Sequence, residues 1–129
     1  MILLPAIDIL DGKPVRLYQG DYAQSECVGD SIADIAQRFV EEGAAYVHMV
    51  DLNGAKDGKK INPDIIVSTA QSIPVPVEVG GGIRTMADVD YYLSQGISRV
   101  ILGTAAIENP TFLREAVTTY QDAIAVGMD

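Results

Sequence analysis

The sequence predicts an α/β protein, namely the N-terminal half of a TIM (βα)8 barrel with four βα units and a fifth strand. Three observations favour this class. Short apolar runs alternate with helical patterns along the chain, which is typical of a parallel sheet. Glycines follow the third and fourth predicted strands, whereas a doubly wound nucleotide-binding sheet carries its glycine fingerprint after the first. A complete barrel has about 250 residues, so we expect residues 1–129 to form a single half-barrel domain.

The predicted strands are short runs rich in Val, Ile and Leu. Such runs are too short for helices, and they suit parallel strands that are covered on both faces. The five runs are Ile2–Ile7, Tyr46–Val50, Val75–Val79, Arg99–Leu102 and Ala123–Met128.

Four helices are predicted between these strands, from apolar residues with i, i+3, i+4 spacing. The four apolar sets are Ile32, Ile35, Ala36, Phe39 and Val40; Ile66, Ala70 and Ile73; Met86, Val89 and Leu93; and Phe112, Leu113, Ala116, Val117 and Tyr120. Start signals support two of these helices. Thr85 with Asp88 three residues later resembles a capping box, and Asn109 followed by Pro110 is typical of a helix N-terminus.

The composition restricts the kinds of partner. Eighteen acidic and nine basic residues give a net charge of −9, which argues against nucleic acid and membrane partners because such surfaces select positive patches. A phosphorylated small molecule is compatible, since backbone N–H groups bind phosphate. Cys27 is the only cysteine, so no internal disulfide is expected. The apolar start holds Asp8 and lacks a basic region, and no apolar run approaches the ~20 residues of a membrane span. We therefore expect a cytoplasmic protein.

Acidic residues close two of the predicted strands, at the edge where barrels of this kind carry their chemistry. Asp8 follows the first strand and Asp129 follows the fifth. Either residue alone is explained equally well as a helix N-cap or as part of a loop salt bridge. Together they would face each other across a barrel mouth, one as a general base and the other as a general acid.

Two glycine-containing segments follow neighbouring predicted strands. Gly81 and Gly82 precede Arg84 after the third strand, and Gly103 and Thr104 follow the fourth. Glycines let a phosphate approach the backbone, and N–H donors at the following turn can hold the anion. Each segment alone is also explained as a tight turn. Side by side in a barrel, the two segments would form one shared phosphate cradle.

Arg16 and His48 are two further candidate site residues, and each also has a purely structural interpretation. Arg16 lies in an extended segment after Asp8, where it would bind a second anionic group or be a solvated side chain on a hairpin. His48 lies within the second strand, which Asp51 follows. If Asp51 points into the barrel, alternation directs His48 toward the helices as a core histidine. A bend at the strand end would let both face inward.

Taken together, these residues resemble the family of ProFAR (phosphoribosylformimino-5-aminoimidazole carboxamide ribotide) isomerases of histidine biosynthesis. The resemblance covers the whole chain. The matching stretches are LLPAIDILDGKPVRLYQGDY, YVHMVDLNGAKDGK, VEVGGGIR, ILGTAAIENP and AVGMD. The family's barrel has about twice this length and two-fold internal similarity, and ILLPAID and AIAVGMD look like the starts of its two halves.

The resemblance implies an intramolecular oxidoreductase, an aldose–ketose isomerase that converts the aminoaldose ProFAR to the aminoketose PRFAR by an Amadori rearrangement. Asp129 matches the family's general acid, which helps to open the ribose ring to a Schiff base. Asp8 matches its general base, which takes the proton from C2′. The substrate is a bis-phosphorylated small molecule, and the family needs neither a metal nor an organic cofactor.

The resemblance also implies which residues bind the substrate. Gly82, Gly103 and Thr104 match the family's first-half phosphate site, whereas Arg16, His48 and Arg84 match positions near the substrate. The second phosphate site and a further active-site threonine belong to the family's second half. We therefore expect the complete protein to be monomeric, and the 129-residue chain by itself to self-associate and to show little activity.

Alternative functions stay open on the sequence. The cyclase subunit of imidazole glycerol phosphate synthase is a sister barrel. A chain of that kind would have a cysteine before the first-strand acid and a lysine in the following loop. This chain has Ala6–Ile7–Asp8 and Val15–Arg16–Leu17 at these places, which favours the isomerase. A bifunctional isomerase that also accepts phosphoribosylanthranilate is a closer variant. A third alternative is a non-catalytic half-barrel.

Overall fold

The strands form one open sheet. The computed structural model describes residues 5–29 and 31–127. The sheet has the strand order β3-β2-β1-β4-β5-β6-β7. The strands are β1 (Ala6–Leu10), β2 (Lys13–Tyr18), β3 (Asp21–Cys27), β4 (Val47–Asp51), β5 (Val77–Gly80), β6 (Arg99–Leu102) and β7 (Ile124–Val126).

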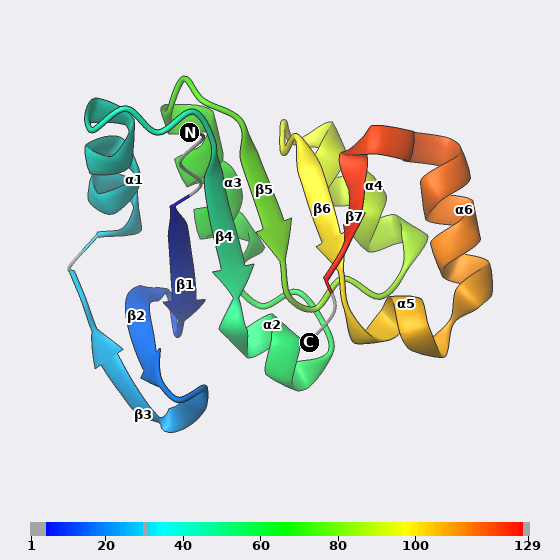
Figure 1. Cartoon of the computed structure of the whole chain (residues 1–129), viewed down its shortest axis with the longest axis horizontal. Coiled ribbons are helices and arrows are strands. Elements are labelled where there is room, and N and C mark those ends of the chain that lie inside the picture. Colours follow the sequence, from blue (N-terminus) through cyan, green and yellow to red (C-terminus); the bar gives the residue numbers. More distant parts are fainter. Residues whose placement is uncertain (1–4, 30, 128–129) are drawn as a thin grey trace.

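Helices connect the strands and cover one face of the sheet. They are α1 (Ile32–Glu41), α2 (Leu52–Asp57), α3 (Pro63–Ser72), α4 (Met86–Ser94), α5 (Thr104–Glu108) and α6 (Pro110–Tyr120), with a 3-10 turn at Gln121–Ala123. Figure 1 shows α3 and α4 behind the strands, and the carboxyl ends of the parallel strands pointing down toward α2 and α5. The other face of the sheet carries no helix among the described residues.

The parallel part of the sheet confirms the predicted α/β class. Strands β1, β4, β5, β6 and β7 pair in parallel, in chain order, and correspond to the five predicted strands. The predicted helices correspond to α1, α3, α4 and α6. This succession of βα units in one curved layer is half of a (βα)8 barrel.

The predicted bounds of the first strand were wrong. The run Ile2–Ile7 placed the strand end before Asp8, but β1 covers Ala6–Leu10, and residues 1–4 lie outside the described part. The strand extends further because β2 pairs with it in antiparallel fashion, from Leu10 opposite Lys13 to Asp8 opposite Val15. Asp8 therefore lies in the middle of a strand.

Alternation along the strands separates a helix-facing core from the open face. On β1, Ile7 and Ile9 are buried against the helices, whereas Asp8 between them is only partly buried. The same pattern holds on β4, where His48 is partly exposed between two buried residues. The core joins these strands to the inner sides of the helices through Val47, Met49, Ile66, Val79, Val89, Tyr92, Val100, Leu102, Phe112 and Ala116, among others.

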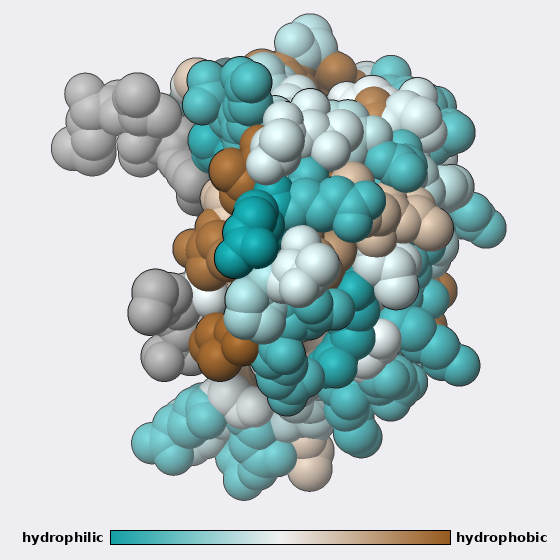
Figure 2. All heavy atoms as spheres, turned by 90° about the vertical axis from the view of Figure 1, so that its right-hand side faces the viewer, coloured by the Kyte–Doolittle hydropathy of each residue, from teal (hydrophilic) through white to brown (hydrophobic). Residues whose placement is uncertain are grey.

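The surface on the side of α5 and α6 is mostly polar. Figure 2 looks at the molecule from the side of α5 and α6, where hydrophilic residues dominate. Hydrophobic residues gather along the left edge of this view, which is the side on which the open face of the sheet lies.

Local capping explains where the helices begin. The Thr85 side chain accepts from the Asp88 N–H and the Asp88 side chain accepts from the Thr85 N–H, which confirms the predicted capping box. Asn109 caps α6 with Pro110 in its first turn, as predicted. In the described part of the chain, no helix is long and apolar enough to cross a membrane.

Candidate active site

Asp8 faces the open side of the sheet at the level where the strands approach their carboxyl ends. It lies beside Val50 on β4, which in turn lies beside Gly80, the last residue of β5. Burial raises the pKa of the Asp8 carboxyl above its ordinary value of 3.8, and the charge interaction with His48 opposes this rise only in part. A carboxylate with a raised pKa is a stronger base, which suits proton abstraction.

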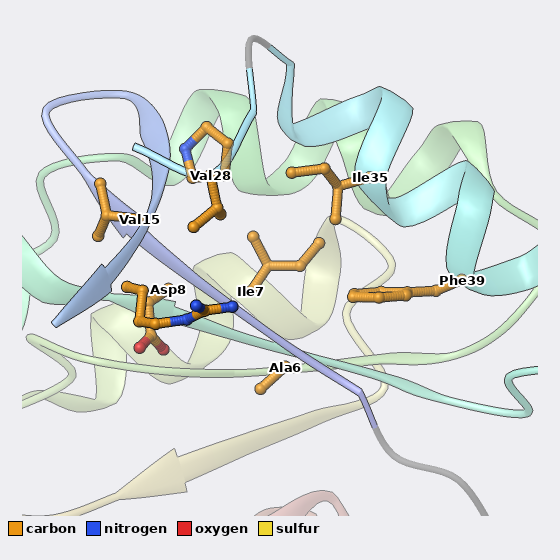
Figure 3. A pocket seen from close by; sticks show the side chains of 9 residues that line it. Ala6, Ile7, Asp8, Val15, Val28, Ile35 and Phe39 are labelled. Atoms are coloured by element: carbon orange, nitrogen blue, oxygen red, sulfur yellow. The ribbon is translucent and has the colours of Figure 1, made fainter. Parts of the chain in front are cut away.

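A cavity of about 250 Å³ adjoins Asp8 under the β2–β3 hairpin. Its walls are apolar side chains of the hairpin and of α1, together with Asp8 and Arg16. In Figure 3 the Asp8 carboxylate points to the side of β1 away from Ile35 and Phe39. Arg16 lies on a hairpin, which was one of the two positions considered from the sequence. Its side chain also lines the cavity that adjoins Asp8.

The hairpin is fixed to α2 at its base and at its tip. The Tyr22 hydroxyl donates to the carbonyl oxygen of Leu52 at 2.8 Å. At the β1–β2 turn, the Asp11 N–H donates to Asn53 Oδ1 at 2.7 Å, and Asn53 Nδ2 donates to Asp11 Oδ1 at 2.8 Å. These contacts hold the strand that carries Arg16 beside the strand ends.

The glycine segments after β5 and β6 line one pocket, as the sequence predicted. This pocket has a volume of about 150 Å³ and lies between the carboxyl ends of the two strands. Its walls include all five residues that were singled out there, namely Gly81, Gly82, Arg84, Gly103 and Thr104. The two segments are therefore adjacent in space.

Gly81 and Gly82 are also required by packing. Both have positive φ, at 106° and 76°, which favours glycine. A Cβ atom on Gly82 would lie 2.5 Å from the Lys59 carbonyl oxygen. Gly103 differs, because its φ is −108° and no atom would lie within 4 Å of a Cβ there. The first glycine pair thus brings the loop after β5 close to the α2 region, whereas Gly103 leaves space at the pocket wall.

Arg84 is the one basic residue that the structure places in the wall of this pocket. Its guanidinium lies 3.7 Å from the Glu108 carboxylate, but both side chains are exposed. Exposed pairs of this kind are weak, so the Arg84 guanidinium is free to turn toward an anion.

Asp51 and His48 face opposite sides of β4, and Asp51 is the one that points toward the helices. Asp51 is fully buried on the helix side, where it accepts from the N–H groups of Gly54, Ile61 and Asn62 at 2.8–2.9 Å. Strict alternation then places His48 on the open face, in the same direction as Asp8. His48 is therefore not a core histidine.

Glu78 and Arg99 adjoin His48 on the open face, and the sequence interpretation missed both. Glu78 Oε2 lies 2.8 Å from His48 Nδ1, and the Arg99 guanidinium donates to Glu78 Oε1. The usable signal was an acidic residue inside the apolar run Val77–Gly80, since buried carboxylates seldom lack a partner. The second acid of the predicted pair, Asp129, lies outside the described residues. Within the described residues, no group of three or more His, Cys, Asp or Glu side chains could hold a metal ion.

Comparison with known proteins gives one consistent result. Residues 2–129 match the family described as "Histidine biosynthesis protein". Three similar proteins carry the name 1-(5-phosphoribosyl)-5-((5-phosphoribosylamino)methylideneamino) imidazole-4-carboxamide isomerase. Identity is 50% over 129 residues for the protein of Clostridium beijerinckii, 54% over 128 residues for Brevibacillus brevis and 49% over 127 residues for Bacillus subtilis.

These alignments cover 98–100% of this chain but 51–54% of each relative. The chain thus spans about half the length of the curated relatives it matches. With the parallel half-barrel and the family match over residues 2–129, the assignment is direct: the chain belongs to the histidine biosynthesis protein family.

Proposed function

We propose that this chain is part of an aldose–ketose isomerase that converts ProFAR to PRFAR by an Amadori rearrangement. One observation carries the proposal. In a chain about half identical to proteins named as such isomerases, Asp8 lies on the open face at the same edge of the sheet as the glycine-lined pocket. A cytoplasmic location stays the expectation from the sequence.

The proposed chemistry divides acid and base between two aspartates. Asp129 donates a proton to the ribose ring oxygen, the C1′–O bond breaks, and a protonated Schiff base forms at C1′. Asp8 then takes the proton from C2′, and the electron pair of that C–H bond moves toward the imine nitrogen to give an enolamine. Protonation at C1′ and loss of the hydroxyl proton at C2′ complete the ketone. The raised pKa of Asp8 supports its role as the base.

We place one substrate phosphate in the pocket lined by Gly81, Gly82, Arg84, Gly103 and Thr104. Glycine lets the anion reach the backbone, and Arg84 adds a positive charge. Strands β1 and β5 are two places apart in the sheet, which is about 10 Å. This separation is short enough for one bis-phosphorylated substrate to contact both the pocket and Asp8. Arg16 and His48 would contact the substrate near the reacting carbons.

The experiment is turnover of ProFAR by the complete protein with Asp8→Asn. This change keeps the shape of the side chain but removes the base, and general acid–base groups contribute typically about 10²–10⁴-fold to rate. Asp57→Asn is the matched control, because Asp57 is an exposed acid on α2 at the same edge of the sheet. Near-normal turnover by Asp8→Asn, or an equal loss in Asp57→Asn, would contradict the assignment.

A further inference from the structure

A row of polar side chains crosses the open face one layer below Asp8. Strand register places His48 opposite Glu78, and Glu78 opposite Arg99. On the other side, His48 lies opposite Ala6, two residues before Asp8 on the same face of β1. His48 is therefore the member of the row that is nearest to Asp8.

The row is held together from its far end. The Arg99 guanidinium lies over the Tyr46 ring, 5.1 Å from its centroid, and donates to Glu78 Oε1. Glu78 is only 5% exposed, and its other oxygen lies 2.8 Å from His48 Nδ1. Burial by itself would raise the pKa of Glu78, but the hydrogen bonds from Arg99 and His48 outweigh it, so the pKa lies below its ordinary value. Glu78 is therefore an ionised carboxylate.

The donors and acceptors in this row have fixed roles. A guanidinium only donates and an ionised carboxylate only accepts, so the proton of the His48–Glu78 contact is on Nδ1. The two ring nitrogens of an imidazole point in diverging directions. With Nδ1 at Glu78 on β5, Nε2 is directed away from Glu78, and β1 with Asp8 lies on the other side of β4.

We propose that Glu78 and Arg99 are positioning residues of the Asp8 centre: Arg99 fixes Glu78, and Glu78 fixes the tautomer and orientation of His48 so that Nε2 faces the substrate beside Asp8. The inference rests on the proposed function, because it takes Asp8 as the base. It assigns a role to two residues that neither contact the reacting atoms nor line the glycine pocket. The competing explanation is an ion cluster that only stabilises the fold.

Glu78→Gln separates the two explanations, because an amide has one acceptor oxygen and one donor NH2 group, whereas the carboxylate has two acceptor oxygens. Arg99 can only donate, so the amide oxygen turns to Arg99 and the amide NH2 faces His48 Nδ1. Nδ1 must then accept, and the ring proton moves to Nε2. Adding Arg99→Met frees the amide to rotate, so that its oxygen again accepts from Nδ1–H. The double variant should thus restore the tautomer that the single variant loses.

The test combines ring nitrogen NMR with turnover, both on the complete protein. With 15N-labelled histidine, the signals lost in His48→Asn identify His48, and the nitrogen shifts of the neutral ring report which atom carries the proton. We expect Nδ1–H in the wild type, Nε2–H in Glu78→Gln, and Nδ1–H again in the double variant. Turnover of ProFAR should follow the tautomer. Partners that orient metal-bound histidines typically contribute about 10–100-fold to activity. We expect kcat to fall by a similar factor in Glu78→Gln with little change in KM, and to recover in part in the double variant.

Asp90→Asn is the matched control, since Asp90 accepts a hydrogen bond from Tyr120 on the helix side of the sheet. It should leave both the tautomer and turnover as in the wild type. An unchanged tautomer in Glu78→Gln, or a double variant less active than the single one, would overturn the proposal in favour of a purely stabilising cluster. A wild-type protein that does not turn over ProFAR would instead refute the proposed function.

Arg99→Met alone keeps the test decisive if Glu78→Gln does not fold. Arg99 is partly exposed, so Arg99→Met changes the packing less than a substitution at buried Glu78 does. Without its anchor, Glu78 should hold His48 less tightly, and the Nδ1 proton should exchange with solvent faster than in the wild type. An unchanged exchange rate would overturn the proposal.

Discussion

Replacement of Asp51 by alanine is expected to destabilise the fold strongly. The Asp51 carboxylate is fully buried and accepts from three backbone N–H groups, of Gly54, Ile61 and Asn62, and from the Asn62 side chain at 2.7 Å. Alanine leaves these donors without their acceptor in a site that water reaches poorly. An unsatisfied buried donor costs about 1–3 kcal/mol, and the contacts of Ile61 and Asn62 are only partly buried, so we expect a loss of about 4 kcal/mol.

That loss is a large part of the 5–15 kcal/mol, roughly, by which proteins are stable. Urea unfolding of the complete protein measures it as a lower midpoint for Asp51→Ala. Asp8→Asn is the natural comparison, because it changes the other acid of a neighbouring strand. The folded-state pKa of Asp8 is raised, so its ionised form opposes folding above pH 3.8, and Asp8→Asn should leave stability at neutral pH unchanged or slightly higher. Equal midpoints for Asp51→Ala and Asp8→Asn would refute this division between a structural and a chemical acid.

Four further predictions test other parts of the structure. Thr104→Val in the glycine pocket should raise the KM for ProFAR in the complete protein by about 10-fold or more, because it removes a hydrogen bond to a charged group. Thr111→Val on α6 is the control and should leave KM unchanged, so equal KM values in the two variants would contradict the phosphate site. Gly82→Val should lower the unfolding midpoint, because its Cβ would meet the Lys59 carbonyl oxygen, and so it tests folding more than binding. Because the folded-state pKa of Glu78 is lowered, its ionised form stabilises the fold at pH values above 4.5, its ordinary pKa, and this contribution is lost as the pH falls through the folded-state pKa. Stability should therefore fall more steeply with acid in the wild type than in Glu78→Gln, and parallel curves would contradict this. The isolated 129-residue chain should sediment as a dimer or larger species at micromolar concentration and turn over little ProFAR, because no described helix covers its open face and β3 and β7 are sheet edges. A monodisperse, fully active monomer would contradict this.

The parallel half-barrel was predictable because each of its strands and long helices carries its own pattern. Apolar runs and i, i+3, i+4 spacing depend only on which face is buried, so they located β4, β5, β6 and the long helices to within a few residues. The β2–β3 hairpin was not located, since most of its residues are exposed and impose no alternation. The edge of the sheet also differs from the prediction. The first strand is not an edge strand, because β2 pairs with it.

The short helix α2 shows why local pattern was insufficient. It has six residues, Leu52–Asp57, one of them glycine, and forms because Asp51 caps its start and Gly58 ends it in the left-handed region. The same capping contact turns Asp51 away from the barrel interior and so decides the direction of His48. This information is in tertiary contacts with Ile61 and Asn62, which strand periodicity does not contain.

The central claim is that Asp8 removes the C2′ proton. The most direct measurement follows deuterium placed at C2′ of ProFAR during turnover by the complete protein, with wild type and Asp8→Asn compared at equal concentration. We predict that the wild-type protein turns over the deuterated substrate more slowly than the unlabelled one and releases the deuterium from C2′. Asp8→Asn should bind the substrate but retain the deuterium. Release of C2′ deuterium by Asp8→Asn at the wild-type rate would contradict the account.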